Sequence, residues 1–455
     1  MKLFCFGVFL CIAFLVNVGQ CATKQKVKYI PINLEDNPPP KKIVCYYNHL
    51  AYKREGKGKV STEELRPALT TCSHLVYAFA GISNSGYHIK SLDKELDTDK
   101  NKGKELFKQI TALKAFQPNL NIMLSIGGFE DDEDQEKYLE VLDDPKQRKS
   151  FIDTTVVALK KYGFNGVDLA WEFPVVNEKK ESYTLGSIWH KIKKTVTGPV
   201  DDNPTLHREH FTLLIREMKA ALRAENYQLS LSILPHINYT VYCDVPSITQ
   251  HLDMITLHAY DFRTPQRNPK EADYSAPLHF VYSRVPHQNA NAMVRWFIEH
   301  GVELQKLVLG IPTFGRSWLL GDDSPKSGIP PILAAGPGDK GTITKEDGLL
   351  SYAEICPQLV SITNAQASPS LLRKQDDPQR RLGTFAFRLP DKKLKQEYGT
   401  WVSFEEPETA GYKASYAKFA GLGGVAIIDL SLDDFRGMCN SNKFPILRAA
   451  RTQFV

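Results

Sequence analysis

The sequence carries little net charge of either sign. Its 455 residues include 57 Lys and Arg against 52 Asp and Glu, a formal excess of +5. An excess this small, spread over so long a chain, argues against a nucleic-acid-binding protein. Beyond the N-terminal segment there is no apolar run of the roughly 20 residues that a transmembrane helix requires. We therefore expect neither a nucleic-acid partner nor a membrane span in the mature protein.

Motifs for bound cofactors are also missing. No group of His and Cys residues has the spacing of a zinc site, and no Gly-x-Gly-x-x-Gly follows the first strand candidate. We therefore expect no metal and no cofactor. The composition is 42% hydrophobic with 29 Gly and 27 Pro, which excludes collagen-like, coiled-coil and wholly disordered chains. A chain of this length and composition is able to bury a large core.

The N-terminal segment has the pattern of a secretory signal peptide. Lys2 precedes an apolar run over residues 3–18, and the small residues Gly19 and Cys21 stand where a signal peptidase cleaves. We expect residues 1–21 to be removed and the mature protein to be secreted. A retained membrane anchor is the alternative, which the short apolar run disfavours.

Cysteine is scarce once the signal peptide is removed. Three of the 8 cysteines lie in that segment, and five remain: Cys45, Cys72, Cys243, Cys356 and Cys439. In a secreted protein, five cysteines predict two disulfides and one unpaired thiol. Any four cysteines allow three pairings, so the spacing alone does not decide the connectivity.

After a polar linker over residues 22–42, short apolar runs alternate with longer amphipathic segments. The strand candidates are Ile43–Asn48, His74–Gly81, Leu120–Gly127, Gly166–Glu172, Gln228–Leu234, Met254–Tyr260, Leu307–Pro312 and Gly424–Leu430. Helical patterns between them include Lys104–Phe116, Gln147–Tyr162, Leu206–Arg223, Ala290–His300 and Thr409–Ala420. Eight such units predict an α/β fold, a (β/α)₈ TIM barrel over residues 43–455. The long connection at about 316–411, between strands seven and eight, predicts a small α+β insertion.

The fourth strand candidate carries the most informative residues. Because side chains alternate along a strand, Asp168, Ala170 and Glu172 share one face, and Trp171 lies on the other. The apolar face suits packing against outer helices, so the carboxylates are predicted to face the barrel lumen. Burying two carboxylates in a packed core costs free energy unless they are paired with other groups or have a functional role. Glu172 lies at the carboxyl end of the strand, where TIM barrels place their active sites.

This segment resembles the D-x-x-D-x-D-x-E signature of the chitinase barrel, glycoside hydrolase family 18. Further matching motifs follow in the family's order: Leu124 to Gly128, Ala259 to Asp261, Pro312 to Arg316, and Gly423 through Phe435. The resemblance extends across nearly the whole mature chain. It implies a barrel enzyme in which the substrate's own 2-acetamido group is the nucleophile.

The resemblance assigns a role to each position of the signature. Glu172 matches the acid that protonates the leaving oxygen, and Asp168 matches the middle Asp. Ala170, however, stands where the family has the Asp that orients the acetamido group, and Asn165 replaces the first Asp. An alanine methyl cannot oppose developing positive charge, so we expect a loss on the order of 10²–10³ in rate. The chain is therefore expected not to be an efficient enzyme, with residual activity through Glu172 as the alternative.

Other family positions are divided between loss and retention. Ile428 replaces the tryptophan floor of strand eight, Phe129 replaces a tryptophan after strand three, Leu50 occupies an aromatic position after strand one, and His258 replaces a methionine. An aliphatic floor weakens sugar stacking. The vestigial site is Asp168, Ala170, Glu172, Tyr260 and Asp261, and the candidate glycan contacts are Tyr47, Phe79, Phe129, Glu172, Tyr260 and Arg316.

The Asp-to-Ala change at Ala170, the long loop after strand four and the lack of a Cys-rich chitin-binding module resemble insect imaginal disc growth factors. That resemblance implies a secreted extracellular ligand that promotes cell proliferation, motility and tissue remodelling without chitin hydrolysis. We expect a monomer whose partners are an unidentified cell-surface receptor and chitin-like or other glycans. Two alternatives remain: a weak chitinase or chitooligosaccharide hydrolase that uses Glu172, and a non-catalytic organiser of chitin or cuticle matrix.

Family resemblance also implies the disulfides Cys45–Cys72 and Cys356–Cys439. Cys243 is then left over, and we favour a buried, inert thiol over the alternative of an intermolecular disulfide. Asn238 begins an Asn-Tyr-Thr acceptor sequence in the loop after strand five. In a secreted protein we expect this residue to be glycosylated.

Overall fold

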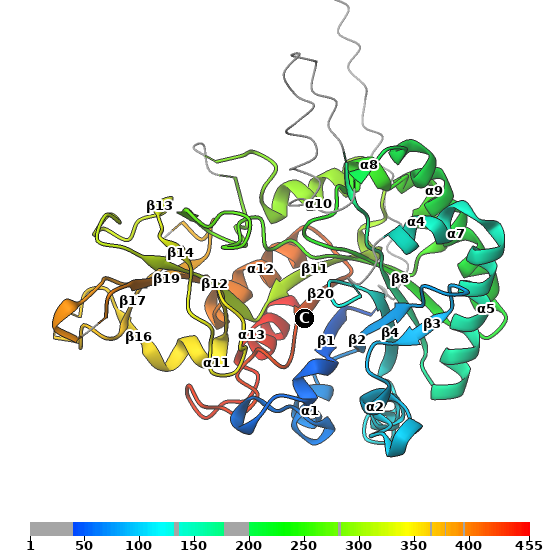
Figure 1. Cartoon of the computed structure of the whole chain (residues 1–455), viewed down its shortest axis with the longest axis horizontal. Helices are drawn as coiled ribbons and strands as arrows, with labels where there is room; N and C mark the ends of the chain where they lie inside the picture. The colour runs from blue at the N-terminus through cyan, green and yellow to red at the C-terminus, as the bar shows by residue number, and fades with distance from the viewer. Residues whose placement is uncertain are drawn as a thin grey trace, which may run out of the picture. The chain divides into compact units, whose positions relative to one another are not determined.

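The computed structural model describes residues 40–131, 136–176, 200–280, 284–364, 366–377, 379–394 and 396–455. The expected signal peptide and most of the expected linker lie outside these ranges. In the described part of the chain, eight parallel strands close into a barrel (Figure 1). In sheet order these strands are β1 (Lys42–Asn48), β20 (Gly424–Ile428), β11 (Leu307–Pro312), β9 (Met254–Leu257), β8 (Gln228–Ile233), β5 (Gly166–Ala170), β4 (Asn121–Gly127) and β2 (His74–Ile82), and β2 pairs again with β1. The predicted TIM barrel is confirmed.

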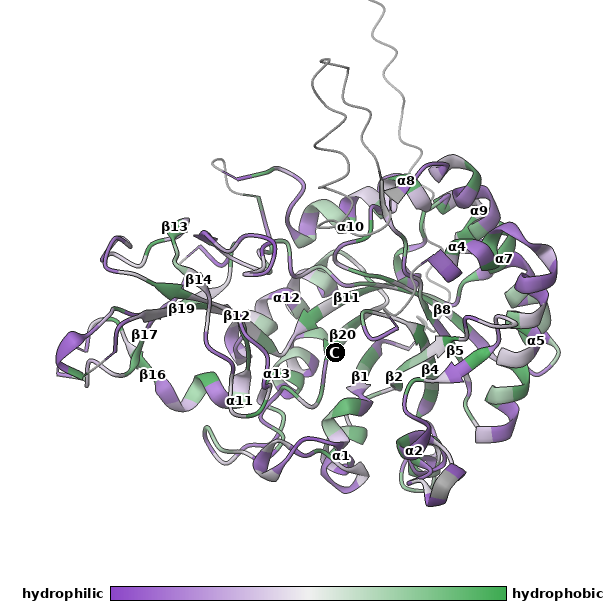
Figure 2. Cartoon of the chain, viewed as in Figure 1, coloured by the Kyte–Doolittle hydropathy of each residue, from purple (hydrophilic) through white to green (hydrophobic). Residues whose placement is uncertain are grey.

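Helices cover the outside of the barrel, and hydrophobic residues gather where helices meet strands (Figure 2). The helices are α1 (Thr62–Leu69), α2 (Lys94–Asp97), α3 (Leu106–Thr111), α4 (Glu136–Asp143), α5 (Pro145–Tyr162), α7 (Pro204–Arg223), α8 (Tyr239–Tyr242), α9 (Val245–Ile248), α10 (Ala290–Glu299), α12 (Pro407–Phe419) and α13 (Pro445–Phe454). The short strands β3 (Ile89–Ser91), β6 (Val175–Val176), β7 (Val200–Asp201) and β10 (Glu271–Ala272) lie in connections.

Local signals at helix ends explain where these helices differ from the sequence pattern. The helix expected at 147–162 begins earlier because the Asp144 carboxylate accepts a hydrogen bond from the Lys146 amide at 2.8 Å, with Pro145 in the first turn. It ends at Gly163, whose φ of 82° closes the helix in the left-handed region. The helix expected at 104–116 is shorter, because α3 gives way to a 3₁₀ turn at Ala112–Ala115.

Between β11 and α12 the chain forms a second sheet at the side of the barrel (Figure 1). Its strands are β12 (Phe314–Leu320), β14 (Gly336–Pro337), β15 (Leu349–Ser351), β16 (Leu359–Ser361), β17 (Leu372–Gln375), β18 (Thr384–Arg388) and β19 (Gly399–Phe404), with the helix α11 (Tyr352–Ile355) and the strand β13 (Ile332–Leu333) nearby. Trp318, Phe385 and Trp401 form the centre of its own small core. The insertion ends before residue 411, because that residue already lies inside α12, which packs on α13.

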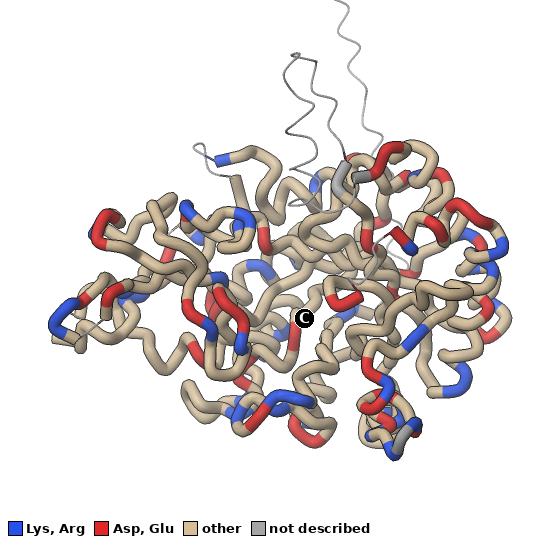
Figure 3. Tube along the Cα trace, viewed as in Figure 1, with Lys and Arg blue, Asp and Glu red and all other residues tan. Residues whose placement is uncertain are grey.

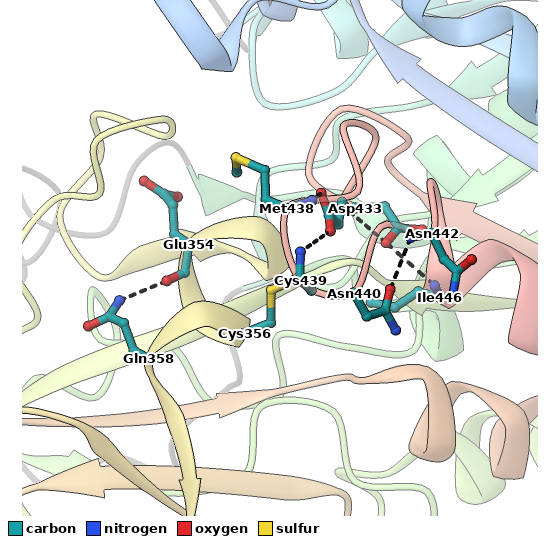
Figure 4. Close-up of a disulfide and its surroundings, with 10 residues drawn as sticks. Glu354, Cys356, Gln358, Asp433, Met438, Cys439, Asn440, Asn442 and Ile446 are labelled. Atoms are coloured by element: carbon teal, nitrogen blue, oxygen red, sulfur yellow. Dashed lines mark hydrogen bonds between the residues drawn. A yellow bond between two sulfur atoms is a disulfide. The ribbon is translucent and has the colours of Figure 1, made fainter. Parts of the chain in front are cut away.

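Two disulfides tie distant segments together. Cys45 on β1 is bonded to Cys72 ahead of β2, and Cys356 after α11 is bonded to Cys439 after β20 (Figure 4). Both pairs are those that the resemblance implied. Cys243 is a buried free thiol whose pKa is raised to about 12 by burial. No helix within the described ranges is both long and apolar enough to cross a membrane.

Candidate functional site

The lumen of the barrel holds a polar cluster around Asp168. This residue is fully buried in the middle of β5, with Ser125 of β4 and Ser230 of β8 as its cross-strand neighbours. Its carboxylate accepts hydrogen bonds from Ser230 Oγ at 2.6 Å and from Ser125 Oγ and Ser232 Oγ at 2.8 Å each. Tyr46 Oη is 3.5 Å away. Each of these donors faces inward because its strand alternates in step with β5.

The environment of Asp168 favours a structural anchor. Burial raises the pKa of this carboxyl, and the hydroxyl donors of Ser230, Ser125 and Ser232 oppose that rise. Burial also raises the pKa of Tyr46, which leaves its hydroxyl protonated as a donor. Because hydroxyl groups from three other strands converge on both oxygens, Asp168 fixes the floor of the lumen below Ala170.

Glu172 lies two residues beyond the end of β5, at the carboxyl rim of the barrel. Its side chain is 2% exposed, and its Oε2 is 2.6 Å from His236 Nε2, in the loop after β8. Its Oε1 is buried and has no hydrogen-bond partner among the described residues. Trp171 points the other way and packs against Tyr138 and Phe151 in the outer layer. The predicted division of β5 into a polar inner face and an apolar outer face is therefore confirmed.

Ala170 fills the wall between Asp168 and Glu172 and is fully buried. The backbone at this point is tightly packed, because the Ala170 carbonyl accepts a hydrogen bond from the Gly128 amide at 2.9 Å. A Cβ at Gly127, whose φ is 107°, would lie 2.1 Å from the same carbonyl oxygen. Gly127 and Gly128 therefore let β4 and β5 approach each other. No carboxylate stands beside Glu172 on this strand, and His236 is its polar partner.

The loop after β9 supplies the opposite wall. His258 Nδ1 is 2.6 Å from Tyr260 Oη, and the His258 ring meets Tyr46 edge to face. Burial lowers the pKa of His258 to about 3, so the imidazole is neutral at physiological pH. Asp261 adopts a φ of 54°, which turns its carboxylate toward Arg316 on β12.

Arg316 and Asp261 form a two-point ion pair. Arg316 Nε and an Nη donate to the two carboxylate oxygens of Asp261 at 2.8 and 2.7 Å. Burial acts to lower the pKa of Arg316, but Asp261, with further contributions from Glu346 and Tyr260, raises it by more, so the net shift is upward. Glu346 lies 3.5 Å from another Arg316 nitrogen. The pair joins the barrel rim to the insertion, so both side chains act first as a clamp between β9 and β12.

The aromatic candidates for sugar contact divide into two groups. Phe129 is 64% exposed and meets the edge of Phe79, which is 7% exposed and lies against Gly128. Tyr47, in contrast, is fully buried on the outer side of β1, and its hydroxyl donates to the Val60 carbonyl at 2.7 Å. The placement of Tyr47 at the site was wrong, because the alternation of β1 puts Tyr46 into the lumen instead.

The positions expected to have lost aromatic rings lie at the rim. Leu50, after β1, is 40% exposed. Ile428 ends β20 and packs beside Tyr260 and Phe314. Glu130, which the sequence analysis did not single out, accepts a hydrogen bond from Asn48 Nδ2 at 2.6 Å, and burial raises its pKa to about 8.

Neither the distribution of charge along the chain in Figure 3 nor a group of potential metal ligands marks the candidate site among the described residues. In the view of Figure 3, acidic and basic segments are interspersed over the outer helices and the insertion. Within the described ranges, one compact group of potential metal ligands occurs, Cys356 with Asp434 and Cys439. Its two sulfur atoms form a disulfide. The carboxylate of Asp434 accepts hydrogen bonds from the backbone amides of Met438 and Cys439 at 2.8 and 2.7 Å. These atoms are therefore already engaged with each other and with the backbone.

Comparison with known proteins agrees with this geometry. The family model of the glycosyl hydrolases family 18 matches residues 42–433. The chain belongs to this family. Within family 18 it is similar to chitinase-like protein EN03 of Bombyx mori, with 47% identity over 90% of this chain and 94% of that protein. It is also similar to imaginal disk growth factor 6 of Drosophila melanogaster, with 41% identity over 91% and 93% of the two chains. It is thus a chitinase-like member of family 18.

Two solved structures are similar to this chain over most of their length. Catalytic domain 2 of the Group II chitinase of Ostrinia furnacalis superposes with a TM-score of 0.74 at 28% identity, covering 91% of this chain and 96% of that one. Human YKL-39, described as a pseudo-chitinase with retained chitooligosaccharide binding properties, gives a TM-score of 0.71 at 25% identity, covering 91% and 99%. The barrel scaffold is therefore shared by proteins named as chitinases and by one named as a pseudo-chitinase.

Sequence reasoning missed several polar side chains in and near the barrel lumen. Ser230 and Ser232 could have been found, because they alternate with Leu229 and Leu231 on β8 and must face inward. His236 carried no such signal. It lies in a loop, and its contact with Glu172 depends on how two rim loops fold together.

Proposed function

We propose that this protein is a secreted, extracellular chitinase-like growth factor that binds chitooligosaccharide-type glycans at the carboxyl rim of its barrel without efficient hydrolysis. Ala170 carries the proposal. Between the buried Asp168 and Glu172, the position that the family resemblance assigns to an orienting Asp holds a fully buried methyl group. Such a group offers neither a hydrogen bond to an acetamido nitrogen nor a negative charge.

The contacts of Glu172 support the same interpretation. One carboxylate oxygen is bound by His236 at 2.6 Å, and the other is buried without a partner among the described residues. A family acid needs a neighbouring carboxylate that tunes and supports it during the reaction, and here its neighbour is an imidazole instead. Aromatic side chains that could contact a sugar are retained, in contrast. Phe129 is exposed at the rim, and Tyr260 lies in the wall of the site formed by the loop after β9.

The relatives support the growth-factor half of the proposal. One similar protein is named an imaginal disk growth factor, and a similar solved structure is named a pseudo-chitinase with retained chitooligosaccharide binding. The retained Glu172 favours one competing function, a weak chitooligosaccharide hydrolase. The two functions differ in whether the carboxylate of Glu172 is needed.

The test compares wild type with Glu172→Gln in two assays. Both proteins are expected to bind an N-acetylglucosamine oligomer by calorimetry and to stimulate proliferation of responsive insect cells equally. Loss of stimulation by a folded Glu172→Gln protein, or rapid cleavage of the oligomer by wild type, would favour the hydrolase.

A second pair of variants locates the glycan. Phe129→Ala removes an exposed ring at the rim and is expected to weaken oligomer binding about tenfold. Phe419→Ala is the matched control, because this ring is 89% exposed at the end of α12, away from the carboxyl rim. Equal affinity of the two variants would contradict binding at the rim.

A further inference from the structure

Basic side chains form a row at the end of the barrel opposite the candidate site. Lys42 begins β1, and Lys306 ends the 3₁₀ turn η6 (Leu304–Lys306) that leads into β11. Lys42 Nζ donates to the Gln305 carbonyl at 2.9 Å, and Lys306 Nζ donates to the Thr249 carbonyl at 2.9 Å. Because carbonyl oxygens carry no net charge, these bonds fix the two ammonium groups at the surface without neutralising them.

Helix α7 extends this row with three more cations. Arg216, Lys219 and Arg223 are spaced at i, i+3 and i+7, so they share one face of the helix over roughly 10 Å of its length. This helix contacts the 3₁₀ turn η5 (Thr249–His251), which precedes β9. Lys219 Nζ donates to Asp253 at 2.5 Å. Arg216 and Arg223 are exposed, and no described residue forms a hydrogen bond or ion pair with either.

The balance of charge on this surface is positive. We call the surface formed by Lys42, Arg216, Lys219, Arg223, His251 and Lys306 the basic end face. Of its five Lys and Arg residues, Lys219 is paired with Asp253, and Lys306 lies 3.5 Å from Glu303, which has 69% of its side chain exposed. The pKa of His251 is lowered, first by burial and then by the charges of Arg223, Arg216, Lys306 and Lys219. The charges of these four residues therefore act together at His251.

We propose that the basic end face binds a linear sulfated polysaccharide. Cations lie at the N-terminal ends of β1 and β11 and continue along one face of α7, where Arg216 and Arg223 have no ion-pair partner among the described residues. Such a row complements a chain that carries anionic groups at intervals. The net charge of the whole protein is only +5, which disfavours a dedicated nucleic-acid surface. This binding goes beyond the proposed function, because it uses the opposite end of the barrel from Phe129 and Glu172. The two glycan sites are therefore independent.

The test measures the affinity of the full-length protein for heparin over a series of salt concentrations. Arg216→Ser/Arg223→Ser is expected to bind about tenfold more weakly, with a shallower dependence on salt. Lys326→Ser/Lys340→Ser is the matched control, because it removes the same charge from two exposed lysines of the insertion. This control is expected to bind within a factor of two of wild type. Both double variants are expected to bind the N-acetylglucosamine oligomer like wild type, which keeps this test separate from that of the rim site.

Three outcomes would overturn the proposal. The first is an equal loss of heparin affinity in both double variants, which would indicate a diffuse effect of net charge. The second is equal binding of a carboxylate-only polysaccharide of the same length, which would remove the role of sulfate. The third is tighter binding of a DNA duplex or of anionic lipid vesicles, lost in Arg216→Ser/Arg223→Ser, which would assign the surface to another class of partner.

Discussion

Restoring a carboxylate at position 170 should recover hydrolysis if Ala170 is the main defect of the site. In Ala170→Asp, the new carboxylate would lie on the lumen face of β5, two residues from Glu172, whose Oε1 is buried without a partner among the described residues. A preorganised group that stabilises developing charge is worth about 10²–10³ in rate, and this is the upper limit of the expected gain. The gain should stay below that limit because Ile428 offers no ring for the sugar to stack on.

The substitution also has a cost in stability. Ala170 is fully buried, and Asp168, two residues earlier on the same face, already has its pKa raised by burial. A second buried carboxyl beside it should lower the free energy of unfolding by about 1–3 kcal/mol. The variants must therefore be compared at equal concentrations of folded protein, established by circular dichroism and urea unfolding.

The assay is a time course of cleavage of an N-acetylglucosamine oligomer by wild type, Ala170→Asp, Ile428→Trp and the double variant. Ile428→Trp should help more in the Ala170→Asp background than alone, since both groups act on one transition state. Adding Glu172→Gln to Ala170→Asp is the control, and it should return turnover to the level of wild type. Efficient cleavage by wild type, or no response of folded Ala170→Asp, would refute the role given to Ala170.

Three further predictions concern stability and modification. Because the folded-state pKa of His258 is lowered from 6.5 to about 3, its contribution to stability is complete above pH 6.5 and is lost as the pH falls. His49 and His74, whose pKa values burial lowers to about 4, lose stability over the same range, so the prediction concerns a difference between two proteins. The loss of unfolding free energy between pH 7.5 and pH 5 should be smaller in His258→Gln than in wild type by on the order of 2 kcal/mol; identical pH profiles would contradict this. Arg316→Met should lower the free energy of unfolding by about 3 kcal/mol by leaving Asp261 unpaired, and adding Asp261→Asn, which tolerates a positive φ, should restore part of it. Asn238 is exposed and accepts a hydrogen bond from Thr240 Oγ1 at 2.7 Å, so Asn238→Gln should lower the apparent mass of the protein in culture medium, and an unchanged mass would exclude a glycan there.

Much of the fold followed from local patterns. Apolar runs of strand length between amphipathic segments predicted the barrel, because parallel strands covered on both faces must be apolar throughout. The ends of helices and strands were predicted less accurately than their existence. The strand expected to reach Tyr260 ends at Leu257, since its last residues turn away into the rim loop that carries His258 and Asp261. That turn uses a positive φ at Asp261, which strand periodicity does not reveal.

The sequence by itself determined the decisive chemical fact about the site, that a methyl group stands at Ala170 between two carboxylates on one face of β5. Alternation along a strand is a local property, and it placed Asp168 and Glu172 inward and Trp171 outward. Only the tertiary structure decided which tyrosine of β1 enters the lumen, because β1 is apolar on both faces and Tyr46 and Tyr47 are adjacent. It alone also decided that His236 binds Glu172, since that contact joins residues 64 positions apart whose loops meet only when the barrel closes.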